Sequence, residues 1–162
     1  MITLTSNHLK KLLNYDPTSG EFRWRVSRGC MSCNVVAGRV MKDGYRRILI
    51  DSQPYVASRL AWFYVHGYWP GRDLDHKNRI RSDDRIENLR EATASQNNAN
   101  SKLRCNNTSG YRGVSWNRRK GKFRAYVSVD RKQIHLGFFY IVERAAAVAK
   151  LARIEHFGEF SS

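Results

Sequence analysis

Asp75 and His76 are adjacent in the chain, and two amide side chains follow them at Asn88 and Asn97. A carboxylate is a good ligand for a hard divalent cation, and an imidazole can take a proton from water near neutral pH. Together these groups could carry out a metal-assisted attack of water on a phosphodiester. The elements around them must then bring the four side chains to one place.

The charge of the chain indicates the substrate class. In 162 residues, 29 Lys and Arg stand against 14 Asp and Glu, giving a formal net charge of +15 and a pI near 10.2. Residues 105–135 alone hold eight basic residues and one acidic residue. Such a surface attracts polyanions, so nucleic acid is the expected partner.

Membrane and secreted classes fit the sequence poorly. No stretch approaches the roughly 20 apolar residues of a spanning helix. Residues 1–13 carry polar and basic side chains among their leucines, so no signal peptide is expected and the protein is expected to stay in the cytoplasm. Cys30 and Cys33 form a C-x-x-C, but Cys105 is the third and last cysteine, so neither a disulfide framework nor a structural zinc site is expected.

The first part of the chain predicts a mixture of short helices and strands. A helix is expected over residues 6–14, ended by the turn chemistry of 16–20. Short strands follow, with turns at residues 43–44 and 51–54, and a second helix is expected from Arg59 to His66, ended by Gly67.

The second part predicts a sheet backed by a helix. Residues 122–129 alternate strictly, with Phe123, Ala125 and Val127 on one face and basic or polar residues on the other. A turn at 131–132 leads to a strand in which Ile134 and Leu136 point inward, and residues 143–156 form a helix with a stripe of small side chains. A linker over 98–109 divides the chain into domains at 1–104 and 105–162.

Residues 105–162 resemble the AP-two/ethylene-response-factor DNA-binding domain, through 111–114, 121–125, 136–138, 145–146 and 157–159. The resemblance implies a three-stranded antiparallel sheet, packed on one helix, that enters the major groove. Arg112 matches the first groove-contacting arginine of that family. The next arginines correspond to Ser115 and Asn117, so the family's base code is not carried over.

Residues 1–104 resemble HNH endonucleases of the homing type from phages and bacteria, with a motif core at about 56–101. The matching segments are 59–62, 69–70, 74–76, 83–93 and 96–97. The resemblance implies an α+β chain in which an N-terminal lobe of small strands and helices carries a ββα-metal, or His-Me finger, nuclease core. One Mg²⁺ or Mn²⁺ ion per active site is implied.

The resemblance also implies a role for each matching residue. His76 would be the general base that takes a proton from the attacking water. Asp75 and Asn97 would hold the metal through oxygen atoms. Asn88 would fix the loop or the imidazole by hydrogen bonds.

Other residues near this motif receive a different interpretation or an open one. Asp73, Asp83 and Asp84 are left out of the site, with Asp83 expected to cap the short helix that follows. Arg79 and Asp84 replace a usual glycine and asparagine. Ser58 stands where relatives usually carry histidine, and it either caps the helix from Arg59 or alters activity.

The expected function is hydrolysis of double-stranded DNA, with nicking by a monomer or weak dimer as the default. One alternative is a non-catalytic, sequence-specific DNA-binding regulator with a degenerate nuclease core, and another is an RNA-binding accessory protein. The basic residues expected to contact DNA are Arg112, Arg118, Arg119, Lys120, Lys122 and Arg124.

Overall fold

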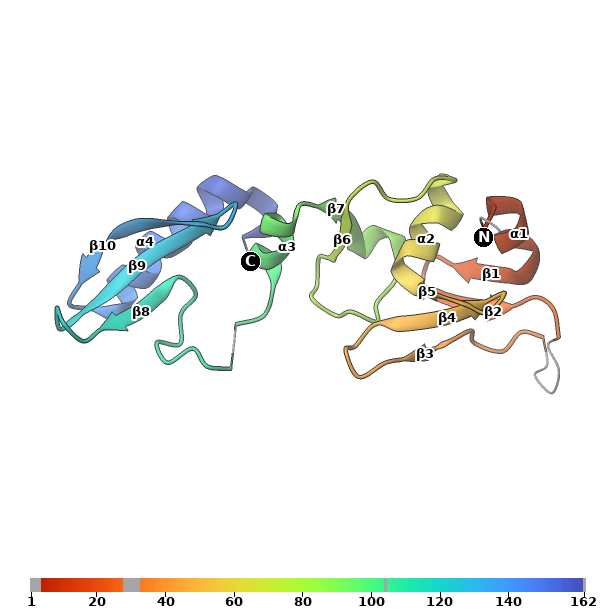
Figure 1. The fold of residues 1–162 in the computed structure, drawn as a ribbon, viewed down its shortest axis with the longest axis horizontal. Helices are drawn as coiled ribbons and strands as arrows, with labels where there is room; N and C mark the ends of the chain where they lie inside the picture. The colour runs from red at the N-terminus through yellow and green to blue at the C-terminus, as the bar shows by residue number, and fades with distance from the viewer. Residues whose placement is uncertain (1–3, 28–32, 104, 162) are drawn as a thin grey trace. The chain divides into compact units, whose positions relative to one another are not determined.

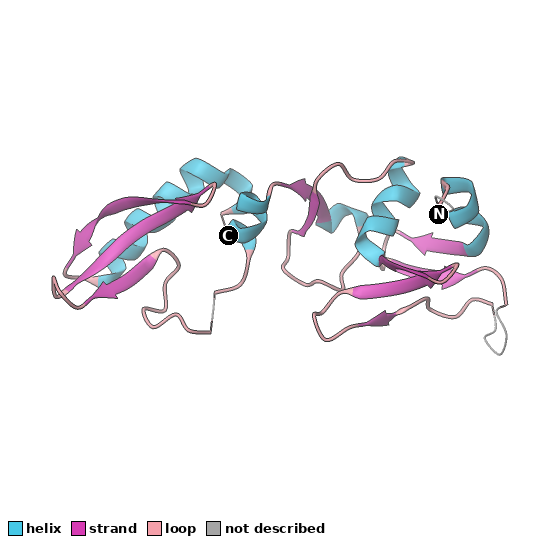
Figure 2. Ribbon diagram, in the orientation of Figure 1, coloured by secondary structure: helices cyan, strands magenta, loops and turns pink. Residues whose placement is uncertain are grey.

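The computed structural model describes residues 4–27, 33–103 and 105–161, and the chain forms two compact units, Met1–Glu91 and Ala92–Ser162 (Figure 1). Four helices and several small sheets make up the described residues, as expected of a mixed fold (Figure 2). Within these residues no helix is both long enough and apolar enough to cross a membrane. Each unit has its own hydrophobic core.

The N-terminal unit begins with a helix and a hairpin. Helix α1, Ser6–Leu12, is capped by the Thr5 side chain, which accepts a hydrogen bond from the backbone N–H of His8. Strands β1, Leu13–Asp16, and β2, Glu21–Trp24, then pair antiparallel. The predicted helix ran to residue 14, but it ends two residues earlier because the buried Leu13 belongs to β1 and pairs with Trp24.

The next part of the unit adds a meander and a helix. Strand β4, Arg46–Ile50, lies between β3, Arg39–Val40, and β5, Gln53–Val56. The turns occur where they were predicted, with left-handed backbone at Gly44, Asp51 and Ser52. Helix α2, Ala57–His66, ends at Gly67 as predicted, since Gly67 adopts φ +80°.

Ser58 lies inside helix α2 and does not cap it. The helix begins at Ala57, its N-cap is Val56, and Ser58 is only 3% exposed. The apolar residues around it explain the earlier start, because Ala57, Leu60 and Ala61 are all fully buried in the core. The capping interpretation of Ser58 is therefore wrong.

The unit ends with the elements that hold the motif of interest. Strand β6, Asp73–His76, pairs with β7, Leu89–Ala92, and the residues between them form a long loop that closes with the short 3₁₀ helix η1, Ile86–Asn88. Leu74 and Leu89 anchor the two strands in the same core as α1 and α2. The loop is thus attached at both ends to rigid structure.

The C-terminal unit is a sheet with a helix on one face. Its three-stranded antiparallel sheet has the order β10, Lys132–Phe139, β9, Lys122–Val129, and β8, Val114–Asn117, and α4, Val142–Phe157, packs on it (Figure 1). This architecture and its helix end at Gly158 are as predicted. A bulge between His135 and Gly137 shifts the register, so Phe138 lies opposite Arg124.

The compact units divide after Glu91 and not after residue 104 as predicted. Helix α3, Ala94–Asn100, starts with a capping box between Thr93 and Gln96, within the motif core assigned to the first domain. Its Ala99 packs with Ala152 and Phe157 in the core of the C-terminal unit. The predicted linker from residue 98 is partly helical for the same reason.

Ala149 tests the close packing of α4 on its sheet. This residue is fully buried with Ala125 and Val114. Replacing Ala149 with Leu should destabilise the C-terminal unit by about 1–3 kcal/mol, because a tight core accepts extra methylenes only with strain. Urea unfolding followed by circular dichroism measures the loss. Leu151→Ala on the outer side of α4, where Leu151 is 67% exposed, should change stability by less than about 0.5 kcal/mol.

Candidate active site

Asp75 and His76 lie at the end of β6, and both residues are buried, with 4% of each residue exposed. Burial of two neighbouring titratable groups costs free energy unless each finds a polar partner. The structure supplies a partner for each of them, and the two partners differ. This pairing defines what the site can do.

His76 pairs with a carboxylate that the sequence interpretation had left out. Its Nε2 lies 3.1 Å from Oδ1 of Asp84, and Asp84 is only 1% exposed. The other oxygen, Oδ2, is buried and has no hydrogen-bond partner among the described residues. Loss of solvent raises the pKa of Asp84, against the opposing effect of His76. Asp84, which the sequence analysis left out of the site, therefore contacts the predicted general base.

The N-terminal hairpin fixes the backbone at Asp84. The hydroxyl of Tyr15 in β1 donates a 2.8 Å hydrogen bond to the Asp84 carbonyl oxygen, and burial raises the pKa of Tyr15. Gly20, at the turn of the hairpin, has φ +75°, and a Cβ there would lie 2.5 Å from the backbone nitrogen of Arg85. Only glycine permits this approach. The hairpin therefore belongs to the support of the site.

Asp75 pairs with Arg90 of the adjacent strand β7. Both Nε and Nη2 of Arg90 lie 2.9 Å from Oδ2 of Asp75, and the two side chains are 11% and 5% exposed. Such a pair compensates the charge of a buried carboxylate. It also fixes the orientation of the carboxylate at the end of β6. Arg90 lies in the 83–93 segment that resembles HNH endonucleases, and the sequence analysis predicted no role for it.

Asn88 holds the loop between β6 and β7 together. Its amide nitrogen donates to the Asn78 side chain at 3.1 Å and to the Asp83 carbonyl oxygen at 2.8 Å, and its amide oxygen accepts from the Asn78 N–H at 3.0 Å. Arg79 has φ +62°, which suits the glycine usual at this position. Asn88 was expected to fix either the loop or the imidazole. These hydrogen bonds go to the loop.

Asp83 is bound by side chains and does not cap η1, whose N-cap is Arg85. Arg85 donates to it from Nε and Nη2, both at 2.8 Å, and Asn78 donates from Nδ2 at 2.6 Å. The hydrogen bonds from Arg85 hold the pKa of Asp83 down at about 2. Asp83 and Asp84 are neighbours whose pKa values move in opposite directions.

The other predicted metal residues are placed as follows. Asn97 lies on α3 in the C-terminal unit, whereas Asp75 lies in the N-terminal unit. Among the described residues no group of three or more His, Cys, Asp or Glu could hold a metal ion. Cys30 lies outside the described residues, and Cys33 and Cys105 are exposed. A carboxylate oxygen and an amide oxygen are hard donors of the kind that Mg²⁺ accepts.

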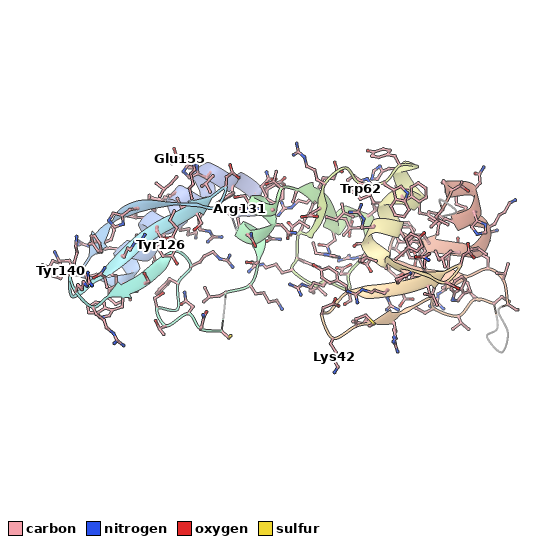
Figure 3. The ribbon with its side chains drawn as sticks, viewed as in Figure 1. Lys42, Trp62, Tyr126, Arg131, Tyr140 and Glu155 are labelled. Carbon is pink, nitrogen blue, oxygen red and sulfur yellow. The ribbon has the colours of Figure 1, made fainter. Side chains whose placement is uncertain are left out.

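Five of the six predicted DNA-contacting residues lie on the hairpin of β8 and β9. Arg118, Arg119 and Lys120 form its turn, and Lys122 and Arg124 lie on β9 with Tyr126 on the face that α4 leaves uncovered. Three of these cations lie over aromatic rings. Two of the rings belong to Tyr126 and Tyr140, which are labelled in Figure 3. The pairs are Lys120 over Phe138, Lys122 over Tyr140 and Arg124 over Tyr126, at 3.9, 4.3 and 5.2 Å.

Arg112 differs from the other five because its guanidinium binds protein oxygens. It donates to the Asn98 carbonyl at 3.1 Å, to the Ser101 hydroxyl at 3.2 Å, and to the Ser101 carbonyl. It also borders a hollow of about 970 Å³ in the C-terminal unit, shared with Tyr126 and Gln133. Arg112 therefore stabilises the end of α3 whatever else it contacts.

Sequence reasoning missed Tyr15, Gly20 and Asp84 as parts of this arrangement. Tyr15 and Asp84 are 69 residues apart, so no local pattern connects them. One signal was present, because Asp84 replaces an asparagine that is usual in relatives. A carboxylate in place of an amide indicates a cationic or proton-donating partner where that position is buried, as Asp84 is.

The pKa values of Asp83 and Asp84 are shifted in opposite directions. Replacing each aspartate with the neutral Asn should therefore have opposite effects on stability. The pKa of Asp83 is lower in the folded state than its ordinary 3.8, so its ionised form stabilises the fold above about pH 4, and this contribution is lost as the pH falls toward 2. Asp83→Asn should lower the free energy of unfolding by about 1–2 kcal/mol at pH 7 and by less near pH 3.

The sign reverses for Asp84, whose pKa is raised by burial. Its ionised form costs stability at neutral pH, and this cost disappears as the carboxyl takes up a proton at acid pH. We therefore compare the free energy of unfolding of Asp84→Asn with that of the wild-type protein at each pH. The difference should favour the variant more at pH 7 than near pH 3. Urea unfolding of both variants at the two pH values checks this, and parallel trends would contradict it.

Comparison with known proteins places the motif in a family. The family model described as HNH endonuclease matches residues 55–99, which contain Asp75, His76 and Asn88. Protein 3.8 of Escherichia phage T7 is 31% identical over 102 residues, covering 62% of this chain and 84% of that protein. With the buried histidine and carboxylates of the β6–β7 region, these similarities show that the chain belongs to the HNH endonuclease family.

Proposed function

We propose that the protein is a divalent-metal-dependent endonuclease that hydrolyses double-stranded DNA, with His76 as the general base. The observation that supports this most is the buried His76, which lies in the matched segment and beside a carboxylate. A general base must be neutral before it acts and must gain a proton in the reaction, and an imidazole does both near pH 7. Nicking of one strand by a site-directed, homing-type enzyme is the finer form of the proposal.

The residues supply most of the chemistry. His76 takes the proton of the attacking water, the water oxygen bonds to phosphorus, and the bond from phosphorus to the 3′ oxygen breaks. Asp75 and Asn97 would hold one Mg²⁺ or Mn²⁺, which when bound polarises the phosphate and stabilises the departing oxygen. Arg90 orients the Asp75 carboxylate through Oδ2. Asn88 keeps the loop that follows the base in one conformation.

The C-terminal unit would bind the duplex. The residues from 92 to 162 carry 13 Lys and Arg against 4 Asp and Glu. Lys122 and Arg124 lie on the face of β9 opposite α4, and the other three cations of the hairpin lie in its turn. A groove of DNA could reach both places. Lys120 and Lys122 would contact phosphates, and arginines of the same hairpin would read bases.

His76→Ala should abolish most of the nuclease activity. Loss of a general base typically lowers the rate by about 10²- to 10⁴-fold. The assay is conversion of supercoiled plasmid to nicked circles in Mg²⁺ or Mn²⁺, with EDTA as the metal-free reaction.

His66→Ala is the matched control, because His66 is an exposed histidine at the end of α2. It should cut at the wild-type rate. DNA binding without metal-dependent cutting by the wild-type protein would favour the alternative of a DNA-binding regulator. A preference for single-stranded RNA over duplex DNA in competition would contradict the proposal altogether.

Replacing Lys120 and Lys122 with Gln should weaken binding to any duplex and flatten its salt dependence. Each phosphate contact contributes about 0.9 to the slope of log K against log salt, so the double variant should lose about 1–2 from that slope. Fluorescence anisotropy over a salt series measures it. Lys150→Gln, on the exposed side of α4, should leave the slope unchanged.

A further inference from the structure

We propose that the outer face of helix α4 is an interface through which two copies of this chain associate as a weak, antiparallel dimer. This inference goes beyond the proposed nuclease function and does not depend on it. It begins from an unusual distribution of side chains on α4. The residues that pack inward are small, namely Ala145, Ala149 and Ala152, whereas the larger Leu151 and Ile154 lie on the outside, where they are 67% and 46% exposed.

The outward residues form one stripe along α4, which consists of Arg144, Ala147, Leu151, Ile154 and Glu155. All five are exposed. The first four follow one another at spacings of three and four residues, which place them on one side of an α-helix. Aliphatic side chains at this spacing are the pattern by which one helix packs against another. The stripe therefore has the form of an unoccupied helix-packing surface.

The charge of this region favours a second copy of the chain as the occupant. The whole chain has a formal net charge of +15, but residues 136–162 hold three Lys or Arg and three Asp or Glu. A neutral surface does not attract a phosphate backbone, so nucleic acid is a poor occupant. Two strongly basic molecules can approach each other here with little mutual repulsion.

The stripe carries opposite charges at its two ends, and these select the antiparallel arrangement. Arg144 lies near the start of α4, and Glu155, labelled in Figure 3, lies near its end. In a parallel pair of helices, equal charges would meet. In an antiparallel pair related by a two-fold axis, Arg144 of each copy meets Glu155 of the other. The same register places Ala147 of each copy opposite Leu151 of the other, so a small side chain faces a large one twice.

The position of these two charges on the helix supports the same arrangement. A cation near the start of a helix and an anion near its end are both disfavoured by the helix dipole. An antiparallel partner compensates each of them with the opposite charge. The two residues are thus placed better for a pair of helices than for an isolated one.

The size of the stripe indicates that the dimer is weak. Helix α4 has 16 residues and is about 24 Å long. A contact confined to its outer face buries less than the roughly 1,200 Å² of a stable complex, so we expect a dissociation constant in the micromolar range or weaker. The dimer leaves the proposed DNA-binding residues free, because Lys122 and Arg124 lie on the face of β9 opposite α4.

Sedimentation equilibrium of the full chain, over a concentration series that reaches the millimolar range, tests the proposal. The weight-average mass should rise from 18.8 kDa towards twice that value. Leu151→Ala should raise the dissociation constant at least about tenfold, because two apolar contacts are lost. Leu49→Ala is the matched control, since Leu49 is a 58% exposed leucine on β4, and it should change nothing. A wild-type protein that stays monomeric would overturn the proposal, and so would a dimer that Leu151→Ala leaves unchanged.

Exchange of the end charges tests the antiparallel register. Arg144→Glu and Glu155→Arg should each weaken self-association about tenfold, because like charges then meet at both ends. A mixture of these two single variants should form a heterodimer as strong as the wild-type dimer, since one copy is acidic at both ends and the other is basic. Failure of the mixture to associate would contradict the register. None of these measurements involves DNA, so this proposal and the nuclease proposal fail separately.

Discussion

The N-terminal unit depends on keeping a carboxylate and an imidazole together in a place that water does not reach. An ionised carboxylate loses its hydration on burial, and one oxygen of Asp84 finds no hydrogen-bond partner in the described part of the chain. Burial of an unpaired polar atom costs about 1–3 kcal/mol. The fold offsets this with a large apolar core around α1, α2 and the hairpin. Tyr15 belongs to that core through its ring, which contacts Phe22, and to the site through its hydroxyl.

The loop between β6 and β7 shows how an irregular segment can be rigid. Its length exceeds that of most connections in compact domains, and such loops are usually functional. Asn88, Asn78 and Asp83 replace the missing regular structure with side-chain hydrogen bonds at 2.6–3.1 Å. Short polar side chains suit this purpose because they reach nearby backbone groups. The histidine before the loop and the asparagine at its end are thus linked through the loop itself.

The periodic elements of this structure and the family could be predicted from the sequence. Alternation over residues 122–129 predicted β9 and its faces, and Gly67 and Gly158 marked two helix ends. The HNH resemblance, quoted on residues 59–97, agrees with the match at 55–99. These features are local, because each depends on neighbouring residues in the chain.

The contacts between segments that are far apart in the chain could not be predicted from the sequence. Asp84 was left out of the predicted site, but the turn of the hairpin approaches it closely at Gly20, and Tyr15 of the hairpin binds its carbonyl oxygen. One of the two interpretations of Ser58 was a helix cap, because serine favours that position, but burial of Ala57 extended the helix. The compact units divide earlier than the predicted domain boundary for a similar reason, because Ala99 packs on residues more than fifty positions later.

The C-terminal unit must remain folded with several basic residues close together, in the turn of the β8–β9 hairpin and on its uncovered face, and its architecture explains how. The helix that covers the other face contributes alanines, so sheet and helix approach closely and form a core from few residues. Three cations of the hairpin, Lys120, Lys122 and Arg124, lie over aromatic rings, which attract them. Mutual repulsion of these cations still opposes folding, and salt screens that repulsion. Salt therefore acts on this unit in two opposite ways: it stabilises the folded sheet and weakens the attraction of the same sheet for a phosphate backbone.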